Sequence, residues 1–142
     1  LALARAGLVH ALSHVTGGGI AANLARVLPV QCAAELDRSQ WTIPDVIELV
    51  ARESGAELSE LERTFNMGVG MLAVVASDDA DAVLRLLADR GVSSWVCGEV
   101  RDRADTDRSD SPAKGGDGGA VMLRGGYRRG SSSASSASSA SS

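Results

Sequence analysis

The 142-residue chain is poor in aromatic residues, proline and cysteine, and it lacks long hydrophobic runs. Phe, Trp and Tyr make up only 3% of the sequence, so a core must be built from Ala, Val, Leu and Ile. The longest uninterrupted apolar stretches are about six residues, far below the ~20 needed to span a bilayer. No basic segment followed by an apolar one opens the sequence, so no secretory signal is predicted. We therefore expect no membrane partner.

Positive charge is also scarce in the first 100 residues. They carry 7 Arg and no Lys against 13 acidic residues, whereas residues 101–142 carry 6 Arg and 1 Lys against 5 acidic residues. A generic nucleic-acid binder needs a positive field, so we expect no nucleic-acid partner. The two cysteines, Cys32 and Cys97, stand far apart without a CxxC spacing, which favours reduced thiols in a cytoplasmic protein.

Composition divides the chain into parts. Residues 1–100 are expected to form the folded domain, and residues 101–119 are rich in Asp, Arg, Ser, Pro and Gly, which favours a flexible polar loop. A short apolar run makes residues 120–127 a possible final strand at the edge of the domain. Residues 128–142 are predicted to be a disordered Ser/Ala-rich tail, because such a repeat buries too little apolar area to offset backbone ordering. The first residues resemble the middle of a domain, so we expect a piece of a longer protein.

Hydrophobic periodicity predicts alternating strands and helices in the domain. The pattern predicts strands at 8–15, 30–36, 69–76 and 93–100, the third of them central, and helices at 20–28, from Pro44 to Gly55, near 59–62 and from Asp79 to Gly91. The spacings Thr42-x-x-Asp45 and Ser59-x-x-Glu62 are typical of capping boxes. This order of elements indicates an α/β (α+β) fold, with helices packed on a mixed sheet.

The segment HVTGGG, residues 14–19, is the most informative stretch. Glycine costs about 0.5–1 kcal/mol relative to Ala inside a strand or helix, but it lets a ligand approach the backbone closely. A strand, a glycine turn and a helix N-terminus together favour an anion such as phosphate. Asn23 and Arg26 follow on the predicted helix, opposite its apolar face, and are candidates for the same ligand. A flexible turn without a ligand explains the pattern equally well, and the Gly-Lys-Ser/Thr of a P-loop is absent.

A second glycine cluster, FNMGVGM at residues 65–71, precedes the expected central strand. One interpretation is that Asn66 is exposed beside a ligand, and that the neighbouring glycines, which have no side chains, let this ligand reach the backbone. The other is a tight turn followed by a bulged strand, and it is favoured when the segment is taken alone.

The titratable residues form no recognisable catalytic set. His10 and His14 lie four apart, but no further ligand has a matching spacing, so no metal site is predicted. The acidic residues at 57–62 and 78–81 are interpreted as helix starts and solvated faces. No Ser/His/Asp or Cys/His arrangement is visible.

These motifs, in this order, closely resemble the C-terminal half of the phosphoribosylformylglycinamidine cyclo-ligase (AIR synthetase) family. The family pattern is H-[IV]-T-G-G-G, then N-x-x-R-x-L-P, then F-N-x-G-[IV]-G-M, and the chain matches it at residues 14–19, 23–29 and 65–71. Three spaced motifs are far more specific than one. The resemblance covers about residues 1–100 and implies the fold of the AIR synthetase C-terminal domain.

The resemblance also implies a reaction, the ATP-dependent closure of the imidazole ring in purine biosynthesis. In this family ATP activates the formyl oxygen of formylglycinamidine ribonucleotide, a nitrogen attacks, and aminoimidazole ribonucleotide, ADP and phosphate form. The implied cofactors are ATP and Mg²⁺, held mainly by an N-terminal half that these residues do not contain. The implied partners are small-molecule nucleotides, that N-terminal half and, in the full-length enzyme, a second copy in a homodimer.

We expect the chain to supply a binding wall and to be inactive alone. The candidate substrate- or nucleotide-binding residues are His14, Thr16, Gly17, Gly18, Gly19, Asn23, Arg26, Asn66 and Gly68. No catalytic residue is assigned. Two alternatives stay open: a non-catalytic binding module, or half of another superfamily member of the amidotransferase synthetase, selenophosphate synthetase or thiamine-phosphate kinase type.

Overall fold

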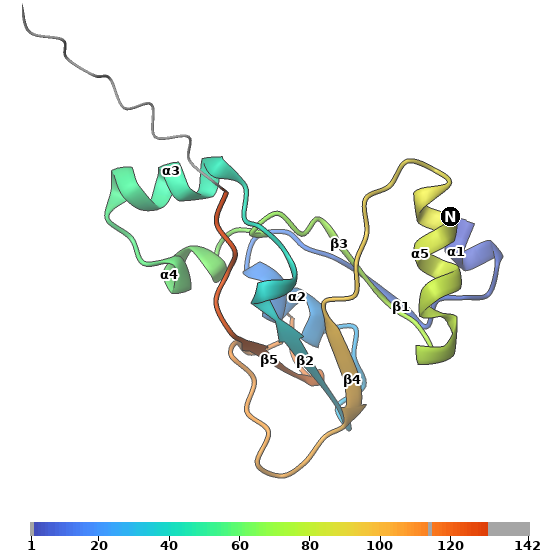
Figure 1. The fold of residues 1–142 in the computed structure, drawn as a ribbon. Coiled ribbons are helices and arrows are strands. Elements are labelled where there is room, and N and C mark those ends of the chain that lie inside the picture. Colours follow the sequence, from blue (N-terminus) through green and yellow to red (C-terminus); the bar gives the residue numbers. More distant parts are fainter. Residues whose placement is uncertain (1, 114, 131–142) are drawn as a thin grey trace, which may run out of the picture.

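The computed structural model describes residues 2–113 and 115–130, in which helices pack on two small β-sheets (Figure 1). The predicted mixture of helices and a mixed sheet is confirmed, although the strands divide between two sheets. Most of the predicted tail, residues 131–142, lies outside the described part. Within the described part, every helix is too short or too polar to cross a bilayer.

Strand β2 (Cys32–Asp37) is the centre of a three-stranded mixed sheet. It pairs antiparallel with β4 (Gly98–Asp102) and parallel with β5 (Ala120–Arg124), where Ala34 lies opposite Val121. Both of these side chains are completely buried. The possible strand at 120–127 is therefore present at 120–124, at the edge of the sheet, and its first four residues belong to the core.

Helix α2 (Gly19–Ala25) packs against β5. All seven of its residues are buried, because its side chains are small or apolar apart from one Asn. A helix that is apolar on every side belongs in a core rather than at a surface. Around it gather buried side chains from the sheet and the loops, among them Val15, Leu36, Trp41, Ile43, Leu61 and Met67.

Strands β1 (Ala11–His14) and β3 (Met71–Val74) form a separate antiparallel ribbon, with His14 opposite Met71. The prediction of a central strand at 69–76 is wrong, because β3 has one strand partner in the described part and its residues alternate between exposed and half-buried. A short apolar run does not distinguish a central strand from a marginal one. In Figure 1 the ribbon leads from the three-stranded sheet toward α1 (Ala2–Arg5) and α5 (Ala80–Ala88).

Helix α3 (Asp45–Ser54) begins directly after Pro44, and the predicted Thr42 cap is wrong. The backbone at Thr42 is extended and bridges to Arg128, and the next amide, that of Ile43, donates to the Arg128 carbonyl oxygen at 3.0 Å. Thr42 is therefore held away from the first turn of the helix by a distant part of the chain. The predicted stop at Gly55 is confirmed, with a φ of 70°.

Other helix and strand boundaries also differ from the sequence pattern. Helix α4 (Leu58–Glu62) is capped by Glu57 together with Glu60, so the predicted Ser59 cap is wrong. Helix α5 follows a 3-10 turn, η2 (Ser77–Asp79), and the Asp79 side chain makes no cap bond. The strand predicted at 93–100 is displaced to 98–102.

Both cysteines are free, as the sequence predicts, and both are half-buried. Burial raises the pKa of the Cys97 thiol, because a thiolate charge is unfavourable away from water. A raised pKa lowers the thiolate fraction at neutral pH, and the Cys97 side chain packs against the core.

Replacing Met122 by Ala should lower the free energy of unfolding by about 2–5 kcal/mol, because the side chain is 2% exposed and its loss leaves a cavity. Arg124→Ala at the end of the same strand should cost less than about 1 kcal/mol, because its ion pair with Glu35 is open to water. Urea denaturation measures both effects. A Met122→Ala variant as stable as the wild type would show that β5 is not part of the cooperative fold.

Candidate functional site

The first glycine turn (residues 16–19) links β1 to α2. Gly18 and Gly19 have φ angles of 100° and 75°, which residues with a Cβ rarely adopt. The backbone of Gly19 also lies against α4, since a Cβ there would fall 1.9 Å from the carbonyl oxygen of Glu62. Gly17, in contrast, is exposed, and a Cβ there would meet no atom within 4 Å. The second and third glycines therefore shape the turn, whereas Gly17 is exposed with open space beside its Cα, and its carbonyl oxygen accepts from the Asn23 Nδ2 at 3.4 Å.

Asn23 holds this turn from the inside. Its side chain is 0% exposed, and its Nδ2 donates to the carbonyl oxygens of Gly19 at 2.7 Å and of Thr16 at 3.2 Å. Its Oδ1 accepts from the Thr16 hydroxyl at 3.3 Å. The sequence pattern placed Asn23 opposite the apolar face of its helix, but α2 is buried on every side. Asn23 thus fixes the shape of the loop, and its contact with a ligand stays a prediction.

The second glycine turn (residues 66–70) lies beside the first. The Val15 amide donates to the Gly70 carbonyl oxygen at 3.0 Å, which extends the β1–β3 ladder to the point where both turns meet it. Asn66 is exposed, and its Oδ1 accepts from the Gly68 amide at 3.0 Å. Within the described residues the Asn66 Nδ2 has no acceptor, so this amide group is available to a ligand.

The remaining predicted site residues fall in different places. The His14 imidazole, at the end of β1, is exposed and makes no hydrogen bond within the described part. Gly68 packs on Pro44, whose Cδ lies 2.8 Å from the position of an added Cβ. Arg26 is exposed at the far end of α2, about 10 Å from the first glycine turn at 1.5 Å per residue. The structure therefore brings His14 and both turns to one edge and leaves Arg26 apart from them.

A buried polar network, which the sequence pattern missed, lies behind the turns. Arg38 begins the 3-10 turn η1 (Arg38–Gln40) and donates from Nε and Nη2 to the two carboxylate oxygens of Glu62, at 2.7 and 2.8 Å. Its Nη1 donates to the Leu123 carbonyl oxygen at 2.6 Å, and the Tyr127 hydroxyl donates to Glu62 Oε2. The assignment of Glu62 to a solvated face is wrong, because the residue is 8% exposed.

Tyr127 extends this network to the second turn. Its ring meets Trp41 edge to face, with centroids 5.4 Å apart, and the Trp41 Nε1 donates to the Met67 carbonyl oxygen at 3.1 Å. Burial, together with the bond to Glu62, raises the pKa of Tyr127 far above its usual value near 10. No local pattern could have found this residue, since it lies 65 positions from Glu62.

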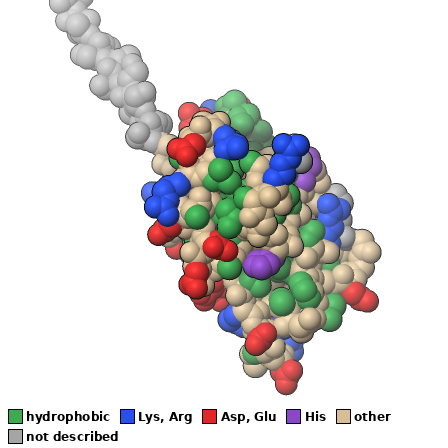
Figure 2. Space-filling model, turned by 90° about the vertical axis from the view of Figure 1, so that its right-hand side faces the viewer, with side chains coloured by type: hydrophobic (Ala, Val, Ile, Leu, Met, Phe, Trp, Pro, Cys, Tyr) green, Lys and Arg blue, Asp and Glu red, His purple; other side chains and the backbone are tan. Residues whose placement is uncertain are grey.

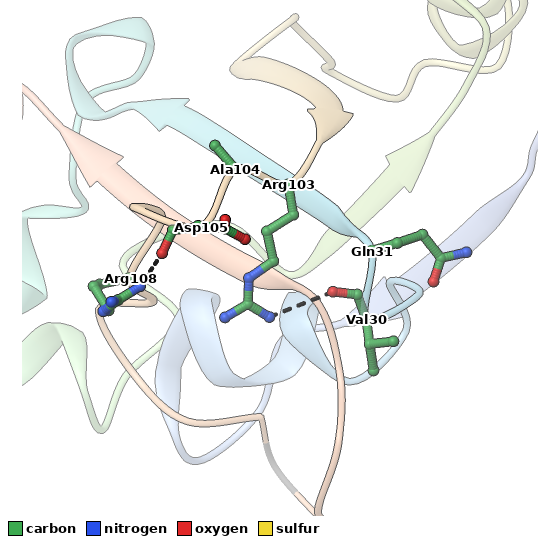
Figure 3. Close-up of a pocket in the computed structure, with 6 residues that line it drawn as sticks. All are labelled: Val30, Gln31, Arg103, Ala104, Asp105 and Arg108. Atoms are coloured by element: carbon green, nitrogen blue, oxygen red, sulfur yellow. Dashed lines mark hydrogen bonds between the residues drawn. The ribbon is translucent and has the colours of Figure 1, made fainter.

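Two surface hollows lie away from the predicted residues. One, of about 400 Å³, is lined by Val30, Gln31, Arg103, Ala104, Asp105 and Arg108 (Figure 3). Both of its guanidinium groups donate to carbonyl oxygens, Arg103 to Val30 at 3.4 Å and Arg108 to Asp105 at 2.6 Å. The other, of about 460 Å³, lies on α3. The candidate site is therefore an open edge of the molecule and not either of these hollows.

Metal binding is not favoured by the described residues. They contain no group of three or more His, Cys, Asp or Glu side chains arranged to hold an ion. On the face in Figure 2 the histidine side chains (purple) lie at separate places on the surface. The edge formed by His14 and the two turns instead offers hydrogen-bond donors, which suit an anion.

Comparison with known proteins decides the family. The pattern described as "AIR synthase related protein, C-terminal domain" matches residues 1–110. The chain belongs to the AIR synthase family. A provisionally named phosphoribosylformylglycinamidine cyclo-ligase of Streptomyces fradiae is 56% identical over 106 residues, which cover 75% of this chain and 58% of the relative. A phosphoribosylformylglycinamidine cyclo-ligase of Nitrosococcus oceani is 44% identical over 92 residues, which cover 65% of this chain and 26% of the relative.

These matches confirm the resemblance drawn from the three motifs. The chain spans less than two thirds of the length of either relative. The AIR synthase pattern ends at residue 110, whereas β5 and Tyr127, which complete the sheet and the buried network, follow it. The matched domain is therefore completed by residues outside the match.

Titration of Tyr127, the only tyrosine, should report its burial directly. In the folded protein the ultraviolet absorbance of tyrosinate should stay low well above pH 10, whereas in denaturant its midpoint should lie near 10. Because the folded-state pKa is the higher one, this contribution to stability should be complete below about pH 10 and decline as the pH rises further. A folded-state midpoint near 10 would contradict the buried network.

Gly19→Ala should lower the free energy of unfolding by at least about 1–3 kcal/mol, because the added Cβ meets the Glu62 carbonyl oxygen at a positive φ. Gly17→Ala is the matched control and should change it by less than about 0.5 kcal/mol, since its Cβ enters open space. Thermal denaturation compares the two variants. Equal losses would show that the first glycine turn has a different shape.

Proposed function

We propose that this chain forms the substrate-contacting wall of an ATP-dependent phosphoribosylformylglycinamidine cyclo-ligase, the enzyme that closes the imidazole ring of aminoimidazole ribonucleotide. The observation that carries the proposal is the pairing of β1 with β3, which places His14, Gly17 and Asn66 at one exposed edge. Membership of the AIR synthase family supports it.

The edge has the chemistry to bind a phosphate. The Asn66 Nδ2 has no acceptor within the described residues, the His14 imidazole is exposed, and Gly17 has no side chain to block the approach of a ligand. The first 100 residues carry 7 basic against 13 acidic residues, so a phosphate is held by such local donors rather than by the overall field. Each hydrogen bond to a charged ligand contributes on the order of 1.5–3 kcal/mol. These residues orient the bound nucleotide.

ATP and Mg²⁺ complete the proposed reaction. When bound, ATP supplies the phosphoryl group that turns the formyl oxygen into a leaving group. The described residues hold no cluster of three metal-binding side chains, so we assign magnesium binding to another part of the enzyme. We place that part in an N-terminal half that faces this edge, within a homodimeric cytoplasmic enzyme.

A chimera tests ring closure. The full 142-residue chain would replace the region that it matches in the Nitrosococcus oceani relative, and ADP release would be measured with formylglycinamidine ribonucleotide. We expect substrate-dependent ADP release from the chimera and none from the chain alone. A folded chimera without ADP release would contradict the proposal.

Two variants of the chimera test the edge itself. His14→Ala and Asn66→Ala should each lower kcat/KM roughly 10- to 150-fold, the effect of losing a hydrogen bond to a charged ligand. Both should melt near the parent temperature, because both side chains are exposed. Arg52→Ala, whose side chain is 69% exposed on α3, is the control and should leave kcat/KM unchanged. Unchanged kcat/KM in the first two variants would remove these residues from the site.

A further inference from the structure

The chain after β5 forms a strap that contacts Glu62 and Trp41, the residues that support the two glycine turns. This C-terminal strap (residues 125–130) runs in Figure 1 from β5 past α4 toward α3, in red. Arg128 fixes the position of the strap through its backbone and its side chain. The Ile43 amide donates to the Arg128 carbonyl oxygen at 3.0 Å, and the Arg128 Nη2 donates to the Gln40 carbonyl oxygen at 2.8 Å. The strap is thus tied to the loop that precedes α3.

Tyr127 connects the strap to the support of the first turn. Its hydroxyl donates to Glu62 Oε2, and the carboxylate of Glu62 is also held by Arg38. The carbonyl oxygen of the same glutamate is the atom against which Gly19 packs, since an added Cβ would fall 1.9 Å from it. A shift of Glu62 therefore moves the surface on which the first glycine turn rests.

The ring of Tyr127 connects the strap to the second turn. It packs edge to face on Trp41, whose Nε1 donates to the Met67 carbonyl oxygen. Met67 is the only non-glycine residue in the described part with a positive φ, 52°, and it is completely buried. Such a backbone conformation persists only where the surrounding structure holds it. Trp41 provides that restraint at Met67, between the exposed residues Asn66 and Gly68 of the second turn.

We propose that Tyr127 is a positioning residue for the candidate phosphate-binding edge, acting on the first turn through Glu62 and on the second through Trp41. The identity of the ligand rests on the proposed function, whereas the coupling of the two turns does not. Tyr127 lies beyond the residues that match the AIR synthase pattern, so the strap couples a segment outside the match to the motifs inside it.

Amide spectra from NMR of the full chain test the coupling without any ligand. Tyr127→Phe removes the hydroxyl and keeps the ring, so the resonances of Gly17–Gly19 should shift while those of Asn66–Gly68 stay near their wild-type positions. Tyr127→Ala should shift both sets. Met122→Ala is the control for lost stability, because Met122 packs in a separate small cluster with Ala33 and Ala120, and it should leave both turns unchanged.

A folded Tyr127→Phe variant with wild-type resonances at Gly17–Gly19 would overturn the proposal. The proposal would also fail if the Met122→Ala control shifted the resonances of the two glycine turns as much as the Tyr127 variants do. The Phe variant decides the question alone if Tyr127→Ala does not fold, because it retains the packing of the ring. If Tyr127→Phe, which keeps the aromatic ring, shifted the Asn66–Gly68 resonances as much as Tyr127→Ala does, the route through Trp41 would also be contradicted.

Kinetics of the chimera provide the second readout. Tyr127→Phe should raise KM about 2- to 12-fold, the range expected for the net loss of one hydrogen bond, with kcat nearly unchanged. A purely structural residue would reduce the folded fraction and leave KM as it was. If the Tyr127 variants shift the turn resonances but the chimera releases no ADP, only the proposed function is contradicted. If the chimera is active but the Tyr127 variants leave the turn resonances unchanged, only the coupling is contradicted.

Discussion

The ion pair between Arg38 and Glu62 joins the parts of the molecule on which the candidate edge depends. Arg38 directly follows β2, Glu62 ends α4, and the same guanidinium reaches the Leu123 carbonyl oxygen in β5. The two side chains are only 19% and 10% exposed, so water screens their attraction less than at a surface. Loss of either partner would leave the other charge buried and unmatched. The pair thereby holds α4 against the sheet, and with it the carbonyl group that backs Gly19.

Local periodicity was enough to predict helices α2 to α5, but not the short α1 or the way the strands pair. Helices α3 and α5 each carry one apolar stripe, and α2 is apolar apart from Asn23, so their positions follow from the side chains near them in sequence. Nothing within β2 specifies β5 as its parallel neighbour, because that choice depends on side chains elsewhere in the core. The predicted cap at Thr42 failed for the same reason, since the competing bond comes from Arg128.

The candidate site, like the fold, could be predicted from the sequence only in part. The motifs identified both glycine turns, and the β1–β3 register explains why two segments so distant in sequence belong to one edge. The direction of the Asn23 side chain was not predictable, because an amide satisfies its bonds equally well with a ligand or with neighbouring carbonyl oxygens. Glu62 was expected on a solvated face, where charged residues usually lie, and Arg38 was assigned no role, because only the folded chain brings the two together.

The parallel pairing of β5 with β2 also constrains how the molecule is made. β5 follows β2 and β4 in the chain, so until it leaves the ribosome β2 has a neighbour on one side only and part of the apolar surface of α2 faces water. Pairings between distant segments form slowly, and exposed apolar surface with an open strand edge favours association between unfinished chains. A polypeptide ending at residue 110 would keep that defect permanently. The limit of sequence similarity is thus not the limit of the folding unit.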